Sequence, residues 1–489
     1  MDLSQAYSSL WADVFATLPL VIVALAGLVV VVFDAFNNRH PATPLITLAA
    51  LAAAFALELP ALSESGTAYY GMIRTGGAAS FVNLIVLGSG FLSVVLAMPY
   101  LKRLNQHIGE VYALMLFATT GMMVLGSADH LVSAFVGLET MSICLYVLTG
   151  LVRKTEGAAE SALKYFLLGA FSTGFFLYGM ALLYGATGTM SIPAMQAAAG
   201  DGSVMFWAGV ALLMVGFLFK VSAAPFHMWT PDVYQGSPTP LTGFMSTASK
   251  AAAFAALIAV VAVALPAERW SGVLAIFAVI TMVIGNVVAL SQSNVKRMLA
   301  YSSIAHAGYI LVALASASPE GYSGALFYLL VYSIMNIGAF GVMSQLEWDD
   351  KQGSEQNLDS LAGVGYRRPL LGWTMAFFMF SLAGFPPLAG FIGKWAVFAP
   401  AIDAGLIWLA IIGVLTSAVS AYYYLRVLVV FFMKPADDAS EASASPFVVP
   451  VSTSVVLVVC ALLLVLMGVT TWGWELTDTF FQTSGLAAF

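Results

Sequence analysis

The chain has 489 residues, of which 61% are hydrophobic and only 9% charged, and its formal net charge is −7. A soluble domain carries about a quarter charged residues, so this composition excludes a soluble globular protein and indicates an integral membrane protein. Many apolar runs approach 20 residues, roughly the length that crosses a hydrocarbon core as a helix. The alternating pattern of a membrane barrel strand is different.

The N-terminal stretch, MDLSQAYSSLWAD, contains acidic residues and neither Lys nor Arg. A cleaved signal peptide begins with a basic region, so we expect the first span to remain in the protein.

Fourteen apolar spans follow one another along the chain, and no soluble domain fits between them. Their approximate ranges are 11–33, 41–59, 79–101, 109–127, 131–151, 160–186, 204–235, 238–265, 271–292, 297–317, 321–346, 370–398, 404–433 and 447–472. The longest polar connection, 347–369, lies between the eleventh and twelfth spans. The sequence therefore predicts an all-α polytopic membrane protein with about 14 transmembrane helices.

Basic residues predict the orientation, because cytoplasmic loops carry an excess of Lys and Arg. The loops and span ends after odd-numbered spans contain twelve: Arg39, Lys102, Arg103, Arg153, Lys154, Lys296, Arg297, Lys351, Arg367, Arg368, Arg426 and Lys434. The opposite side contains two, Arg74 and Arg269, together with many acids. We therefore expect the odd loops to be cytoplasmic and both termini to be periplasmic.

Charged residues inside the spans are the first candidates for function. The remaining four basic residues, Lys164, Lys220, Lys250 and Lys394, all lie deep in apolar segments, and Glu139 is the one acid interpreted in the same way. A charge at the bilayer centre costs a few kcal/mol, so such residues usually face a bundle interior and carry function. One glutamate cannot pair with four lysines, which argues against purely structural ion pairs.

The type of these residues suits proton transfer. Loss of water disfavours the charged form of a lysine, whereas a nearby carboxylate favours it, so a neighbouring charge decides whether the proton leaves. Histidine passes protons through either ring nitrogen, and His227 and His306 also lie in apolar surroundings. For each histidine alone, packing is the simpler interpretation. Beside the lysines, both become candidates for an auxiliary role in a relay.

Motifs for cofactors or metals are missing from the sequence. Cys144 and Cys460 lie in separate apolar runs, without metal-ligand spacing or a disulfide framework, and we interpret both as small core residues. The sequence has no Gly-rich nucleotide loop, Cys cluster or paired-His motif. We therefore expect no redox cofactor and no metal in this chain.

Two spans contain prolines that interrupt a helix. The stretch FLFKVSAAPF (217–226) aligns with FMFSLAGFPP (378–387), with Pro225 on Pro386 and Lys220 on Ser381, and Lys394 follows the second break. Two broken spans in corresponding positions are typical of repeat-built transporters. Since the seventh and twelfth spans are an odd number of spans apart, the repeats are inverted.

The predicted organisation has four parts. They are three N-terminal helices (1–108), a first five-helix repeat (109–265), an inverted second five-helix repeat (266–433) and a C-terminal helix (434–489), with one broken helix in each repeat.

Four stretches resemble the antiporter-like membrane subunits of respiratory complex I, the proton-pumping NADH:quinone oxidoreductase, and among these the subunit N group. They are ESALKYFLLGAFSTGFFLYG (160–179), PFHMWTPDVYQGSPTPLTGFMSTASKAAAFA (225–255), NVKRMLAYSSIAHAGY (294–309) and GFPPLAGFIGKW (384–395). The resemblance covers essentially the whole chain, and the second stretch is the most specific. Lys394 matches subunit N, whereas a related subunit has glutamate at that position.

The resemblance implies a proton channel with a Glu–Lys pair, here Glu139 and Lys164, and a central lysine on a broken helix, Lys220. It further implies a connecting lysine, Lys250, and an exit-side lysine, Lys394. His227 and His306 match positions near a central hydrated axis. The resemblance also implies that the flavin, the iron–sulfur clusters, the NADH site and quinone reduction belong to other subunits.

The expected location is the bacterial inner membrane. The expected partners are neighbouring membrane-arm subunits, lipids, water and protons, with no nucleic acid. A subunit of a multisubunit cation/proton antiporter, with the same fold but no redox partner, remains an alternative because fold alone does not fix function. A purely structural membrane scaffold is a second alternative, which neutral substitution of Lys164 or Lys220 would distinguish.

Overall fold

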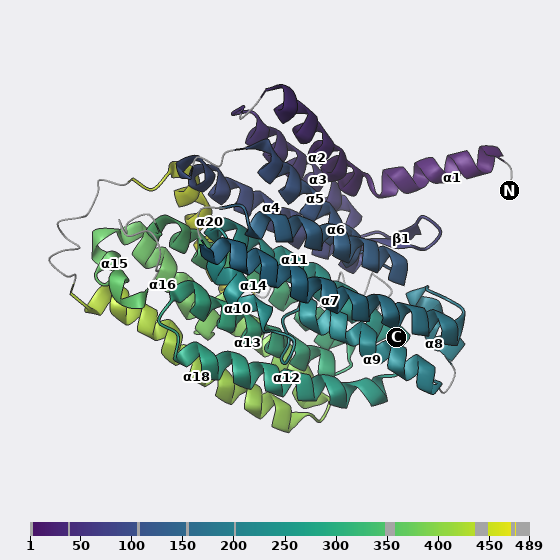
Figure 1. Ribbon diagram of the computed structural model, residues 1–489. Coiled ribbons are helices and arrows are strands. Elements are labelled where there is room, and N and C mark those ends of the chain that lie inside the picture. The colour runs from purple at the N-terminus through teal and green to yellow at the C-terminus, as the bar shows by residue number, and fades with distance from the viewer. Residues whose placement is uncertain are drawn as a thin grey trace.

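The computed structural model describes residues 3–37, 40–104, 108–152, 156–199, 202–347, 357–435, 448–470 and 475. Arg39, Arg153, Lys154 and Lys351, which contribute to the predicted orientation, lie outside these ranges. Most helices run side by side along one direction, and α1 projects away from the bundle (Figure 1).

The N-terminal part contains α1 (Leu3–Ala16), α2 (Leu18–Phe36), α3 (Thr43–Ala61), β1 (Ser65–Ala68), β2 (Ile73–Gly76) and α4 (Gly77–Arg103). The strands form an antiparallel hairpin with Ser65 opposite Gly76. This hairpin lies outside the spans and is an addition to the predicted all-helical architecture. Its turn uses positive φ angles at Tyr69, Tyr70 and Gly71, a local conformation that apolar periodicity does not predict.

The middle of the chain contains α5 (Gly109–Gly126), α6 (Leu131–Thr149), α7 (Glu156–Thr187), α8 (Ile192–Ala199), α9 (Val204–Lys220), α10 (Trp229–Gly236), α11 (Thr239–Ala259) and the π-helical segment η1 (Val260–Ala264). The rest contains α12 (Ala267–Leu290), α13 (Val295–Ala315), α14 (Pro319–Leu346), the 3₁₀ turn η2 (Leu358–Leu361), α15 (Val364–Arg367), α16 (Pro369–Ala383), α17 (Ala389–Asp403), α18 (Ile407–Met433) and α20 (Val451–Val469).

Within the described ranges, twelve helical stretches are long and apolar enough to cross a membrane, and α9 and α16 are shorter apolar helices. Each of the fourteen predicted spans corresponds to one of these helices. The two spans predicted to be broken are indeed interrupted, one between α9 and α10 and the other between α16 and α17. The prediction of a polytopic helical membrane protein is confirmed.

The two predicted repeats use the same order of helix contacts. Helix α5 packs on α6 as α12 packs on α13, and α7 packs on both α9 and α10 as α14 packs on both α16 and α17. Helix α11 returns to α5 as α18 returns to α12. This parallel supports the predicted repeat, whose boundaries remain a prediction.

Small residues bring neighbouring helices into close contact, as is common in membranes. A Cβ atom at Gly121 of α5 would lie 2.4 Å from the Met141 nitrogen of α6, and one at Gly137 of α6 would lie 2.5 Å from the Leu125 nitrogen of α5. The backbones of α5 and α6 therefore touch where the two glycines meet.

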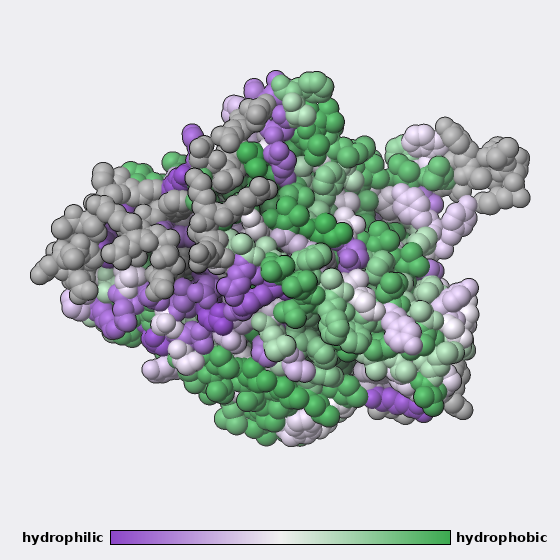
Figure 2. All heavy atoms as spheres, in the orientation of Figure 1, coloured by the Kyte–Doolittle hydropathy of each residue, from purple (hydrophilic) through white to green (hydrophobic). Residues whose placement is uncertain are grey.

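Burial separates an inner set of helices from an outer set. Nearly all of α11, α13 and α14 is buried, whereas α2, α12 and α18 expose many large apolar side chains. Figure 2 shows this apolar surface in green and a large group of hydrophilic residues toward the side of α15. A lipid environment suits the outer helices, and the inner three form the core in which the candidate site lies.

Candidate functional site

Lys220 is the last residue of α9, and its side chain is buried. Its ammonium donates a hydrogen bond to Ser142 Oγ of α6 at 2.7 Å. The same nitrogen lies 5.4 Å from the ring centroid of Tyr165 and 5.9 Å from that of Tyr146. One neutral hydroxyl and two aromatic faces thus surround the charge, without a direct carboxylate contact.

The break after Lys220 satisfies backbone groups locally. Ser222 has a φ of 65°, an uncommon conformation for a residue with a Cβ atom. The Ala223 amide then donates back to the Leu218 carbonyl at 2.8 Å, which closes the end of α9 in the manner of a helix cap. The helix therefore ends inside the protein with this backbone amide still hydrogen-bonded.

The second break repeats this turn. Gly384 has a φ of 86°, and the Phe385 amide donates to the Phe380 carbonyl at 3.0 Å. Matching the two turns places Pro225 opposite Pro387, one residue from the alignment expected from the sequence. The geometry of the two turns determines how the two segments align, whereas the similarity of their apolar residues does not.

Glu139 of α6 accepts a hydrogen bond from Thr173 Oγ1 of α7 at 2.7 Å. Thr173 also lines a small cavity together with Ser142 and Lys220. The cavity offers about 10 Å³ of room, which is near the minimum for one water molecule. Lys220 thus lines this space directly, whereas Glu139 is connected to it through Thr173.

Lys164 lies elsewhere, and the implied direct pair with Glu139 is not formed. Its ammonium lies 2.6 Å from Glu160 Oε1 and 2.7 Å from Asp232 Oδ2, and 41% of its side chain is exposed. Thr173, the partner of Glu139, is nine residues further along α7, or about 13 Å. Lys164 therefore belongs to a charged cluster near the start of α7 and not to the deep interior.

Lys250 of α11 is buried against α13. Its ammonium donates to the Ser303 carbonyl at 2.8 Å and to Ser303 Oγ at 2.5 Å. Tyr332 of α14 donates to the same Oγ at 2.8 Å, and Asn336 Nδ2 donates to the Tyr332 hydroxyl at 2.9 Å. Lys250 is thus one end of a hydrogen-bonded network across three inner helices.

His306 continues this network three residues along α13. Nδ1 lies 2.6 Å from the Tyr328 hydroxyl of α14, and Nε2 lies 2.9 Å from the Tyr424 hydroxyl of α18. Its ring centroid is 5.2 Å from that of Tyr332. The histidine therefore links two tyrosines from different helices and is more than a packing residue.

Lys394 of α17 lies beyond His306. Its ammonium donates to the Ala383 carbonyl at 2.8 Å and to Ser417 Oγ at 2.6 Å, and lies 5.4 Å from the ring centroid of Tyr309. A Cβ atom at Gly384 would lie 2.9 Å from Cδ and 3.1 Å from Nζ of Lys394. The Lys394 side chain therefore packs directly against the backbone of the second break at Gly384.

Helix α13 organises these contacts. Ser303, His306 and Tyr309 are spaced by three residues and therefore share one face of the helix, and each contacts a different part of the site. Ser303, Tyr309 and the tyrosines of α14 were not among the candidates predicted from the sequence. A polar residue at every third position of YSSIAHAGY, inside a span, is the signal that could have revealed this face.

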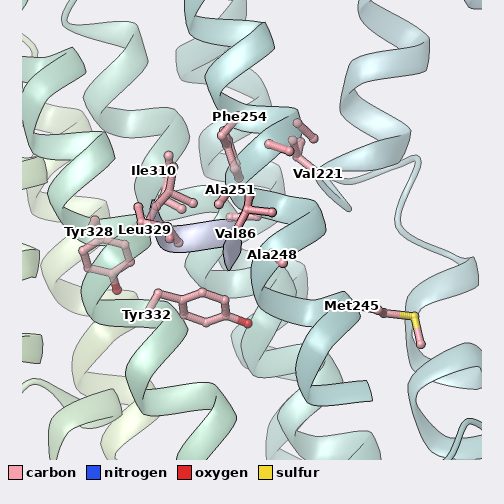
Figure 3. Packing of buried hydrophobic residues seen from close by; sticks show 14 of the residues in the cluster. Val86, Val221, Met245, Ala248, Ala251, Phe254, Ile310, Tyr328, Leu329 and Tyr332 are labelled. Carbon is pink, nitrogen blue, oxygen red and sulfur yellow. The ribbon is translucent and has the colours of Figure 1, made fainter. Parts of the chain in front are cut away.

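Apolar residues follow both Lys220 and Lys250 along the chain. Val221 follows Lys220, and Ala251 and Phe254 follow Lys250; all three are buried members of the hydrophobic core (Figure 3). Among the described contacts, no hydrogen bond joins the two lysines.

His227 is placed apart from the inner network. It follows the first break and is partly buried, and its Nδ1 atom has no hydrogen-bond partner among the residues that the structure describes. The structure does not bring it into hydrogen-bonding contact with the relay lysines.

Three further charged residues outside the predicted site are also buried. Glu58 of α3 accepts a hydrogen bond from Asn83 Nδ2 at 2.8 Å, and Asp34 of α2 accepts one from the Gly109 amide at 3.0 Å. Lys296 at the start of α13 donates to the Ser237 carbonyl at 2.7 Å. Burial of charged groups is therefore not confined to residues in the middle of spans, because neighbouring segments can bury residues near span ends.

A cavity of about 380 Å³ lies at the hairpin end of the bundle. Arg74 and Asp129 line it, with Arg74 Nε 3.6 Å from Asp129 Oδ1, and no relay lysine does so. Burial raises the pKa of the Asp129 carboxyl, whereas Arg74 and His130 lower it. Over the described ranges, no cluster of three or more His, Cys, Asp or Glu residues forms a metal site.

Residues 128–420 match the family described as NADH:quinone oxidoreductase/Mrp antiporter, transmembrane. The chain is 59% identical over 497 aligned positions to a NADH-quinone oxidoreductase subunit N of Salinibacter ruber, covering 100% of this chain and 99% of the relative.

A chain of the respiratory complex I structure from Thermus thermophilus with bound aureothin is similar, with a TM-score of 0.79, 37% identity and coverage of 92% and 97% of the two chains. A chain of the Mrp complex from Dietzia sp. has a TM-score of 0.86 at 20% identity, covering 97% and 98%, and this likeness concerns the fold alone. The predicted resemblance is confirmed: the chain belongs to the NADH:quinone oxidoreductase/Mrp antiporter family and, within it, to the subunit N proteins.

Proposed function

We propose that this chain is a proton-translocating membrane-arm subunit of a NADH:quinone oxidoreductase. The observation that carries the proposal is the continuous contact of Lys250, Ser303 and Tyr332 with His306 and its tyrosines, next to Lys394. Protonatable groups aligned along one buried helix face are what proton transfer between neighbouring side chains requires.

The proposed cycle begins at Lys220, which takes a proton from the cytoplasmic side while Glu139 is ionised and close. Neutralising or moving that carboxylate weakens the hold on the proton. At 6 Å, and with an effective dielectric constant of about 20, the interaction between two unit charges is roughly 3 kcal/mol. Moving one charge against 100 mV costs about 2.3 kcal/mol. Electrostatic coupling therefore has a magnitude that suits each step.

The proton then moves to Lys250 and, through the α13 face, to Lys394. No described hydrogen bond joins Lys220 to Lys250, so water or a side-chain movement must link them, and this step is the natural point of control. Lys394 releases the proton outward when a charge change arrives from a neighbouring subunit. Lys164 contributes through Asp232 instead of through a direct pair with Glu139, and His227 stays an auxiliary candidate.

The proposed setting is the inner membrane of a bacterium, with the odd loops in the cytoplasm and both termini in the periplasm. NADH oxidation, the flavin, the iron–sulfur clusters and quinone reduction are assigned to other subunits. The alternative of a cation/proton antiporter subunit without redox partners is supported by the shared family description and the likeness in fold, whereas the similar relatives are named as subunit N. Co-purification with redox subunits supports the first assignment, and their consistent absence supports the second.

The test uses the assembled enzyme in proteoliposomes, with proton translocation and quinone reduction measured together. Lys220→Ala and Lys250→Met should lower the number of protons moved per electron, because each removes a protonatable group. Lys434→Ala is the matched control, since this lysine is exposed and pairs with Asp359. Unchanged translocation in both relay variants would falsify the relay.

A further inference from the structure

Asp232 joins three helices at one carboxylate. Its Oδ2 atom lies 2.7 Å from Lys164 Nζ of α7, and its Oδ1 atom lies 2.7 Å from Arg297 Nη1 of α13. Arg297 also donates to Gln235 Oε1 at 3.1 Å. Since α7 and α13 belong to different predicted repeats, one aspartate on α10 holds both halves of the molecule together.

Helix α10 is the segment that follows the first break, so its position matters for Lys220. Trp229, three residues before Asp232, stacks on Tyr165 with ring centroids 4.5 Å apart and planes inclined by 6°. The Trp229 indole nitrogen donates to the Phe219 carbonyl at 3.0 Å, and Tyr165 is one of the two rings facing the Lys220 ammonium. A displacement of α10 therefore reaches Lys220 through one stacked pair.

We propose that Asp232 is a positioning residue for Lys220: shared between Lys164 and Arg297, it latches α10 closed over the cytoplasmic approach to the buried lysine. The proposal rests on the relay proposed above and adds its gate. Asp232 is suited to this task because only 30% of its side chain is exposed, so its charge is partly protected from solvent screening. Opening the latch separates Trp229 from Tyr165 and admits water beside Lys220.

Backbone contacts show that α10 is held closely and that the latch is not its only support. Ser161 Oγ of α7 donates to the Asp232 carbonyl at 2.8 Å, and a Cβ atom at Gly236 would lie 2.0 Å from the same Oγ. These contacts do not involve the carboxylate. Removing its charge should therefore loosen α10 without unfolding the bundle.

The test compares Asp232→Asn with Asp232→Glu in the assembled enzyme, using hydrogen–deuterium exchange of peptides covering residues 229–237 and the number of protons moved per electron. In Asp232→Asn, exchange in α10 should become about fivefold faster, the scale expected for a partly exposed ion pair, and the proton ratio should fall while quinone reduction continues. Asp232→Glu should restore both values, because it restores the charge.

Asp359→Asn is the matched control, since it removes an exposed ion pair with Lys434 and should change neither readout. If Asp232→Asn does not assemble, Arg297→Gln replaces it. Arg297→Gln removes one of the two ion pairs of Asp232, so it should act in the same direction, and it keeps the pair with Lys164. Unchanged exchange in α10, or faster exchange with an unchanged proton ratio, overturns the latch. The proposed relay is tested separately: unchanged translocation in Lys220→Ala would refute it. The exchange measurement on α10 does not depend on that result.

Discussion

Gly384 offers the sharpest test of the second break, because a methyl group there would meet Lys394 directly. Its φ of 86° costs a residue with a Cβ atom about 1–2 kcal/mol. The added Cβ would also lie 2.9 Å from Lys394 Cδ, whereas ordinary carbon contacts are about 3.5–4.0 Å. The lysine side chain therefore has to withdraw by roughly half an ångström or more.

That movement is large compared with the tolerance of the lysine hydrogen bonds. The ammonium donates at 2.8 Å and 2.6 Å to Ala383 and Ser417, and a hydrogen bond to a charged group contributes about 1.5–3 kcal/mol. Weakening one of them by about 1.4 kcal/mol changes a rate or an equilibrium about tenfold. We expect Gly384→Ala to slow proton translocation by about this factor, in addition to lowering stability.

Gly405 provides the matched control. Its φ is 80°, and nothing lies within 4 Å of the Cβ position, so Gly405→Ala carries the backbone cost alone. The melting temperature of the assembled enzyme should fall in both variants, and further in Gly384→Ala because of the added clash. The initial rate of acidification in proteoliposomes should fall only in Gly384→Ala. Equal acidification rates in the two variants would refute the reasoning. In a Lys394→Ala background, Gly384→Ala should add no further loss of rate.

Three further predictions concern α5, α6 and α7. Ser142→Ala should lower proton translocation several-fold in the acidification assay, because it removes the hydroxyl that accepts from Lys220. Ser93→Ala removes a buried hydroxyl without a described partner and should leave translocation unchanged in the same assay. Thr173→Val should weaken translocation at unchanged quinone reduction, because the glutamate of α6 loses its hydrogen bond. Gly137→Ala should lower the melting temperature and the yield of assembled enzyme because α5 and α6 touch there, whereas Gly174→Ala meets open space and should preserve or raise stability.

Each of these comparisons has a clear contrary result. Equal losses in the two serine variants would show that a buried hydroxyl matters for packing alone. An unaltered proton ratio without the threonine hydroxyl would remove that hydrogen bond from the relay. A glycine pair with identical melting temperatures would mean that α5 and α6 can separate without cost.

Apolar length predicts the fourteen spans well, because the bilayer imposes one thickness on every helix. Apolar length does not predict the hairpin Ser65–Gly76, because the hairpin depends on the conformation of its turn. Apolar length also predicts that Lys164 is buried, whereas the lysine is partly exposed. The position of a lysine along a span does not reveal which carboxylate its side chain reaches. Asp232 lies 68 residues away in sequence, and a single sequence holds no record of that proximity.

The candidate site shows the same division. Lys220, Lys250 and Lys394 stand out in the sequence because charge is rare in a span, and all three are buried in the structure. Their partners do not stand out, since serine and tyrosine are common in membrane helices. Ser303 becomes meaningful only when α11 is packed against α13, and this packing is a tertiary fact.

The contact between Lys250 and Ser303 has a consequence for biosynthesis. The two residues are 53 positions apart, so at about 5–20 residues per second the ribosome makes the partner roughly 3–10 s after the lysine. During that interval α11 carries an ammonium group without its native acceptor. We therefore expect a chain truncated before α13 to be less stable than the full chain, and a pulse-chase measurement of its lifetime checks this.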